Sequence, residues 1–96
     1  MKLRQYEPCQ RYRKKKNRAQ REQLWRRCHG RCWYCGKSVG RKAFRLDHQE
    51  PFSKGGADSN RNLVVACANC DGEKGAMGVE EYRLKRGGVQ FYGETI

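Results

Sequence analysis

The sequence predicts a small α+β fold with an apolar core too thin to hold the chain together without help. At 96 residues, 36% of them hydrophobic, with a mean hydropathy of −1.11, the chain allows one domain of modest core. Two CxxC pairs, Cys32/Cys35 and Cys67/Cys70, are separated by 31 residues. Short β-prone runs lie between them, and a basic segment precedes them. We therefore expect short strands and helices that are cross-linked through the cysteines.

The basic charge is concentrated at the N-terminus. Residues 1–31 hold 12 Lys and Arg against two Glu, a net charge of +10 out of a total of +12. Residues 1–16 repel one another and predict a flexible basic arm, which leaves residues 17–96 as one domain. Such density favours binding to nucleic-acid phosphates through Arg13, Lys14, Lys15 and Lys16, continued by Arg18 and Arg21. A solvated tail kept for solubility is the alternative, and the arm lacks the wide apolar face of a membrane-binding segment.

A helix is expected directly after the arm. Asn17 is a favoured N-cap residue, and Gly30 is a favoured stop. Between them Leu24, Trp25 and Cys28 recur at helical spacing and form one apolar stripe. The rest of the helix surface is largely arginine, so a basic helix should lead into the first CxxC pair.

Two strands and two further helices are expected after it. Residues 43–48 alternate apolar Phe44 and Leu46 with polar neighbours, which predicts a strand whose last two residues, Asp47 and His48, point to opposite sides. Residues 53–60 are rich in turn formers and predict a loop. Residues 63–66 form a second β-prone run, followed by short helices at about 67–74 and 79–85. Residues 90–96 are expected to be a tail or a final short strand.

The four paired cysteines predict a structural metal site. No signal-peptide core or transmembrane run is present, so we expect a cytoplasmic protein with reduced thiols. A two-residue gap lets both thiolates of a pair face one ion, and Gly36 permits the turn that follows. Four thiolates complete a tetrahedral Zn²⁺ site with no position left for water. An iron–sulfur cluster also fits four cysteines and stays open as an alternative.

The segment from about residue 31 to 75 resembles the HNH nuclease family. The features that carry the resemblance are the two cysteine pairs, the Asp47-His48 pair, Pro51, the Gly55-Gly56 loop, the Asn62-Leu63 pair and the Lys74-Gly75 end. The resemblance implies a ββα-metal fold with a divalent ion between the first strand and the helix, held together by a separate zinc. The fold class is thus a small α+β domain with a ββα-metal core and two zinc knuckles.

The resemblance also implies roles for individual residues. By position, His48 is the general base that deprotonates an attacking water, Asp47 is a ligand of the catalytic ion, and Asn62 braces the loop that orients the histidine. Histidine suits the first role because its ordinary pKa lies near neutral pH. Carboxylate oxygen suits hard ions such as Mg²⁺ or Mn²⁺. Lys74, near the end of the motif, is a further candidate for contacting DNA phosphate.

Asp71 is a departure from the family pattern, which has His or Asn after the last cysteine of the second pair. An aspartate there keeps an oxygen ligand and favours Mg²⁺ or Mn²⁺ over ions that prefer nitrogen. Alternatively, Asp71 caps a helix in an impaired enzyme.

The resemblance implies a DNA endonuclease that hydrolyses phosphodiester bonds and leaves 5′-phosphate and 3′-hydroxyl ends. Its basic arm would add affinity through the phosphate backbone. The alternative is a non-catalytic, zinc-finger-like module that binds DNA or RNA. By analogy with small free-standing members of the family, a phage or another mobile element in a bacterial host is the expected setting. Either a nick or a double-strand break would be the product of this expected cleavage.

Overall fold

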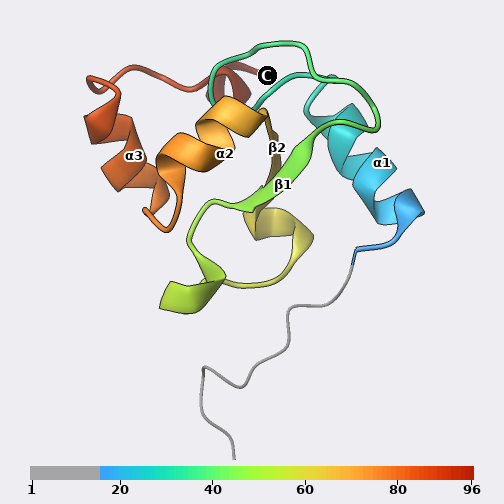
Figure 1. Cartoon of the computed structure of the whole chain (residues 1–96), viewed down its shortest axis with the longest axis horizontal. Helices are drawn as coiled ribbons and strands as arrows, with labels where there is room; N and C mark the ends of the chain where they lie inside the picture. Colours follow the sequence, from blue (N-terminus) through green and yellow to red (C-terminus); the bar gives the residue numbers. More distant parts are fainter. Residues whose placement is uncertain (1–15) are drawn as a thin grey trace, which may run out of the picture.

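The structure is a computed structural model in which residues 16–96 are described. Strands β1 (Arg45–His48) and β2 (Leu63–Ala66) form an antiparallel two-stranded sheet. Helix α1 (Arg18–Arg27) packs against one face, and α2 (Ala68–Lys74) follows β2 on the other face, with α3 (Val79–Lys85) beyond it (Figure 1). The predicted small α+β fold with a ββα core, β1–β2–α2, is confirmed.

Both faces of β2 are buried, and its side chains divide the core into two clusters. Leu63 and Val65 face α1, where they pack with Leu24, Cys28 and Phe44. Val64 and Ala66 face the opposite side, in a cluster that also holds Cys32, Tyr34, Cys67, Cys70, Tyr82 and Phe91. Burial on both faces explains why this strand is a continuous apolar run instead of an alternating one. The second cluster joins the cysteine pairs to an aromatic core.

Helix α1 begins as predicted and ends earlier than predicted. The Asn17 side chain accepts a hydrogen bond from the Gln20 amide at 2.8 Å, as an N-cap does. The helix stops at Arg27, three residues before Gly30, because His29 and Gly30 both take left-handed backbone angles, with φ of 59° and 69°. The resulting turn directs the chain into the first cysteine pair.

The first strand is shorter than predicted. The structure places residues 41–43 in a turn, so the strand starts at Arg45, although Phe44 is still buried against α1. The second strand occupies residues 63–66 as expected. The helices after it, α2 and α3, also lie where they were expected, and Cys67 caps α2 through its sulfur, which accepts from the Cys70 amide at 3.4 Å. None of the helices in residues 16–96 is long and apolar enough to cross a membrane.

The C-terminal segment is neither a free tail nor a strand, so that expectation was wrong. Residues 92–95 form a 3-10 turn, and Phe91 is fully buried in the aromatic cluster. Backbone hydrogen bonds run from Tyr92 to the Tyr34 carbonyl at 3.2 Å and from Gly93 to the Trp33 carbonyl at 2.7 Å. Arg83 on α3 pairs with Glu94 and holds the turn from outside. The segment therefore packs against the two residues between Cys32 and Cys35.

Gly93 should be intolerant of any side chain. A Cβ atom there would lie 1.9 Å from Trp33 Nε1, in a close backbone approach. We expect Gly93→Ala to lower the free energy of unfolding by about 1–3 kcal/mol, because the indole or the turn must move. Urea unfolding followed by circular dichroism measures this. Gly72→Ala is the matched control, since a Cβ there meets nothing within 4 Å and lies inside α2. Equal stability of the two variants would contradict the prediction.

Candidate active site

Strand β1 sends Asp47 and His48 to opposite faces of the sheet, as the sequence predicts. Asp47 lies opposite Val64 and contacts the side of the sheet that carries α2. His48 lies opposite Leu63 and contacts the loop between the strands. Adjacent residues of an extended strand must diverge in this way. The carboxylate and the imidazole therefore lie on opposite faces of β1, at the end of the strand.

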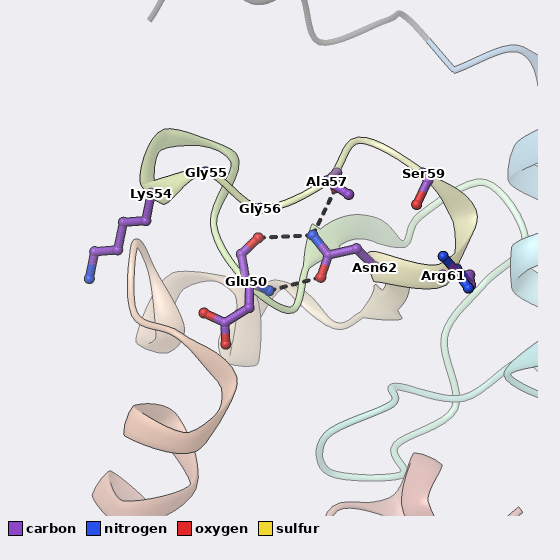
Figure 2. A pocket seen from close by; sticks show the side chains of 8 residues that line it. All are labelled: Glu50, Lys54, Gly55, Gly56, Ala57, Ser59, Arg61 and Asn62. Atoms are coloured by element: carbon purple, nitrogen blue, oxygen red, sulfur yellow. Dashed lines mark hydrogen bonds between the residues drawn. The ribbon is translucent and has the colours of Figure 1, made fainter. Parts of the chain in front are cut away.

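Asn62 closes the loop that connects the two strands. Its Oδ1 accepts from the Glu50 amide at 3.0 Å, and its Nδ2 donates to the carbonyls of Glu50 at 2.9 Å and Ala57 at 2.8 Å (Figure 2). Three bonds from one amide tie the start of the loop to its far end. Gly56 passes so close to Glu50 that an added Cβ would lie 1.9 Å from the Glu50 carbonyl oxygen. A tight loop is thus fixed beside His48.

His48 is held by a carboxylate that the loop delivers. Its Nε2 lies 2.9 Å from Asp58 Oδ1, and both side chains are 10% exposed. Lys16, just before α1, reaches the same oxygen at 2.6 Å. The Phe52 ring lies 5.8 Å from the imidazole, centroid to centroid. The histidine is consequently enclosed by a polar pair and an aromatic ring.

Asp47 belongs to a buried network with Tyr34 and Lys74. The Tyr34 hydroxyl donates to Asp47 Oδ2, and Lys74 Nζ lies 3.1 Å from the same oxygen. Burial raises the pKa of Asp47, which the tyrosine hydrogen bond and the lysine charge oppose and the nearby negative charge of Asp71 reinforces. Burial and the Asp47 charge also raise the pKa of Tyr34 far above its ordinary value. A divalent ion bound here would favour the ionised carboxylates.

Lys74 is not at the surface, where a DNA contact would require it. Its side chain is fully buried, and its ammonium donates to the His48 carbonyl at 2.8 Å besides pairing with Asp47. Those bonds satisfy a charge that would be costly to bury alone. Lys74 thus connects α2 to the backbone of β1, and we leave it out of the proposed DNA contacts.

Asp71 stands in the first turn of α2, on the same face of the sheet as Asp47. It pairs with Arg45 of β1 at 3.5 Å and is partly exposed. Its backbone amide donates to the Cys67 carbonyl, and Cys67 is the residue that caps the helix. The structure therefore does not support the alternative in which Asp71 is the cap. Two carboxylates, from β1 and α2, face the same side.

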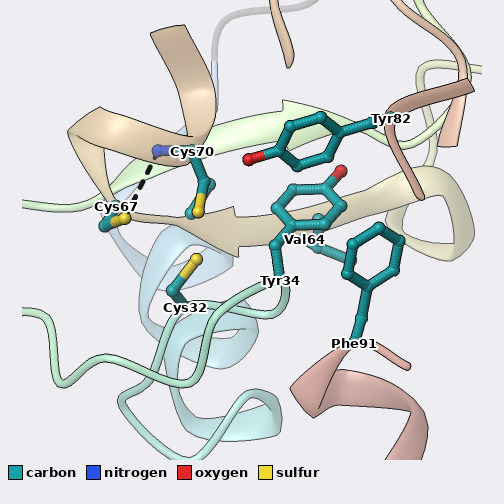
Figure 3. Packing of buried hydrophobic residues seen from close by; sticks show 8 residues of the cluster. Cys32, Tyr34, Val64, Cys67, Cys70, Tyr82 and Phe91 are labelled. Carbon is teal, nitrogen blue, oxygen red and sulfur yellow. Dashed lines mark hydrogen bonds between the residues drawn. The ribbon is translucent and has the colours of Figure 1, made fainter. Parts of the chain in front are cut away.

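The four paired cysteines meet at one point. Their sulfur atoms all lie within 4.8 Å of one another, and Cys35 and Cys67 are 3.8 Å apart. Tetrahedral zinc with bonds of about 2.3 Å separates its sulfurs by about 3.8 Å, so the cluster fits this ion. Figure 3 shows Cys32, Cys67 and Cys70 beside the rings of Tyr34, Tyr82 and Phe91. In residues 16–96 these cysteines are the only His, Cys, Asp or Glu group found that could hold a metal through three or more ligands.

Burial sets the protonation of these thiols. It raises the pKa of Cys32 and Cys70. At Cys67 burial also acts to raise the pKa, but hydrogen bonds from the Cys70 amide and the neighbouring thiols act in the opposite direction. Together these hydrogen bonds prevail, and the pKa of Cys67 is lowered. Zinc binding must therefore displace protons from buried thiols, and it gains from any nearby positive charge. Arg86, just after α3, supplies one, with Nη1 3.8 Å from the Cys70 sulfur.

Comparison with known proteins agrees with this geometry. Residues 32–76 match the family model described as HNH endonuclease. These residues form an HNH domain. Among solved structures, the type II-C Cas9 enzyme from Actinomyces naeslundii is similar, with a TM-score of 0.63 and 28% sequence identity over 70% of this chain. The match spans 8% of the Cas9 chain. No curated protein matches this chain.

The HNH domain includes both cysteine pairs, the strands and α2, and it agrees within a residue with the segment expected from sequence. Helix α1 precedes it. Arg18 is exposed on α1, whereas Arg21 donates to the Phe44 carbonyl at 3.3 Å and covers its ring. Arg13, Lys14 and Lys15 lie outside the described residues. Lys16 is turned inward to Asp58.

Sequence reasoning missed three residues that contact the HNH site. Asp58 was assigned to a turn-rich loop, and nothing in its spacing from His48 predicts their contact. Tyr34 was recognised only as part of the first cysteine knuckle. Arg86 lies 16 residues after Cys70, and its approach depends on how α3 folds back. In each case the signal is a tertiary contact, which no local pattern carries.

Proposed function

We propose that the chain is a metal-dependent DNA endonuclease that hydrolyses phosphodiester bonds. The observation that carries the proposal is the divergence of Asp47 and His48 from one strand end, with Asp71 on the Asp47 side. An in-line displacement needs a base on one side of the phosphorus and charge stabilisation on the side of the leaving oxygen. Adjacent residues of one strand can serve both sides of a phosphate that lies against its end. The HNH family match supports the same reaction class.

His48 would act as the general base in this reaction. Its ring takes a proton from water as the water oxygen bonds to phosphorus, and the bond from phosphorus to the 3′ oxygen breaks. The leaving 3′ oxygen takes a proton from solvent water, so that a 5′-phosphate and a 3′-hydroxyl result. Asn62 keeps the loop closed around the histidine, since its three hydrogen bonds fix both ends of that loop.

Asp47 and Asp71 would hold the catalytic ion. Tyr34 and Lys74 both bind Asp47 Oδ2, so Oδ1 is the atom offered to an ion. Oxygen ligands suit Mg²⁺ or Mn²⁺, which when bound would stabilise charge on the phosphate and the leaving oxygen. Arg45 would exchange its contact with Asp71 for one with DNA phosphate.

DNA would be held mainly through its phosphate backbone. Residues 1–16 form the basic arm of this proposal, residues 17–96 form the single nuclease domain, and exposed Arg18 extends the positive charge along α1. Such contacts release counterions and carry no base preference. The expected setting is the cytoplasm, with phage or mobile-element origin as the working hypothesis.

A supercoiled plasmid tests the proposed function. Purified protein with Mg²⁺ or Mn²⁺ should convert it to nicked or linear DNA, and EDTA added at a concentration that leaves the buried zinc in place should prevent this. A zinc-finger-like module would shift the plasmid on a gel without cutting it under any of these conditions. A plasmid that is shifted but not cut would contradict the proposed nuclease activity and favour the non-catalytic binding module.

Asp71 should affect the dependence on the catalytic metal. We expect Asp71→Ala to raise the Mg²⁺ concentration for half-maximal cleavage by about 10–100-fold, because one of two carboxylates is lost. Cleavage rates measured across a Mg²⁺ titration provide the check. Glu73→Ala on the same helix is the control, since its side chain pairs with Tyr82. An unchanged metal dependence would remove Asp71 from the ligands.

A further inference from the structure

Asp58 stands where a residue that sets the orientation of His48 would stand. Its Oδ1 lies 2.9 Å from Nε2, and both side chains are nine-tenths buried. A carboxylate can only accept a hydrogen bond, so Nε2 carries the proton and Nδ1 presents a lone pair. We propose that Asp58 is a positioning residue that holds His48 in this tautomer, with Nδ1 as the proton acceptor. The inference rests on the proposed nuclease function.

The loop places Asp58 with little freedom. Asn62 binds the carbonyl of Ala57, the residue directly before Asp58, at 2.8 Å. It also binds both backbone groups of Glu50, two residues after His48. One side chain therefore connects the segment after the histidine to the segment that carries its partner. Asp58 supplies the physical link through which Asn62 can orient the imidazole.

Lys16 keeps this carboxylate compatible with DNA. Its ammonium lies 2.6 Å from the oxygen that also faces His48. An uncompensated carboxylate at this position would repel a phosphodiester, whereas the Lys16–Asp58 pair carries no net charge. Lys16, the last residue of the basic segment, is thus part of the site around His48.

During the reaction the proton of the water moves to Nδ1 and the imidazole becomes positively charged. Asp58 then faces an imidazolium across the same Nε2 hydrogen bond, which is stronger for charged partners. The carboxylate does not take the proton. Its effect should be confined to the rate of the chemical step, because it does not touch DNA in this arrangement.

Nuclear magnetic resonance tests the tautomer directly. The chain has two histidines, so two-bond ¹H–¹⁵N spectra of the full-length zinc-loaded protein contain two ring systems, and His29→Asn assigns them. With the ring neutral, we expect His48 to carry its proton on Nε2. A proton on Nδ1 would overturn the proposal, and this readout requires neither cleavage nor a variant at Asp58.

The kinetics of DNA cleavage by Asp58 variants provide a second test of the proposal. Asp58→Asn should lower kcat about 100-fold and change KM for DNA less than about 3-fold, and Asp58→Glu should recover part of the rate. Glu22→Gln is the control for loss of one carboxylate on α1, away from His48. An unchanged kcat in zinc-loaded Asp58→Asn overturns the positioning role. A wild-type protein that binds the plasmid without cutting it would instead overturn the proposed function itself, whereas the His48 tautomer would still be readable by NMR.

Discussion

Replacing Cys70 by serine is expected to unfold the protein at physiological temperature. Cys70 is buried, caps no helix itself, and lies at the junction of the cysteine cluster and the aromatic core. A zinc site of this kind stabilises small domains by on the order of 10 kcal/mol at neutral pH, which is comparable to the whole stability of such a chain. Losing one thiolate ligand should therefore remove most of the free energy that holds residues 32–35 to residues 67–70.

Metal analysis and thermal unfolding measure this together. As purified, the protein should hold about one zinc per chain, and iron at that level would point to a cluster instead. Cys70→Ser should lose the zinc and its cooperative transition. Cys28→Ala is the matched control, because Cys28 is equally buried but packs against α1 and β2, away from the cluster. If removal of zinc from the wild-type protein left its melting temperature unchanged, that result would contradict the prediction.

Loss of the imidazole in His48→Ala is expected to lower cleavage by about 100- to 10,000-fold. The side chain points away from Asp47, so both candidate metal ligands and the zinc cluster should survive the change. Binding to plasmid DNA should also survive, since the phosphate contacts lie elsewhere. Nicking assays report the rate, and gel shifts report binding.

His29→Asn is the control for His48→Ala. His29 is exposed and has a φ of 59°, a conformation that asparagine tolerates better than most residues. Its cleavage rate should match the wild type. Wild-type nicking by His48→Ala would mean either a contaminating nuclease or a wrong assignment of the base.

Several parts of the site can be read from the sequence because they depend on local geometry. Strand alternation places Asp47 and His48 on opposite faces, and the two-residue gaps bring each cysteine pair together. The approach of Lys74 to the backbone of β1 depends instead on how α2 packs across the sheet. For that reason a lysine expected at the DNA surface is buried against Asp47.

The cysteine scaffold and the order of strands and helices follow from spacing and period, which chain geometry fixes over a few residues. The Asp47-His48 pair was singled out by the resemblance of its surrounding motif to the HNH family. Tertiary packing is what brings Asp58 to both His48 and Lys16, Tyr34 and Lys74 to Asp47, and Phe91 into the aromatic core. Asp58 lies 10 positions from His48 and 42 positions from Lys16 along the chain, and close packing, which no local pattern records, brings these residues together.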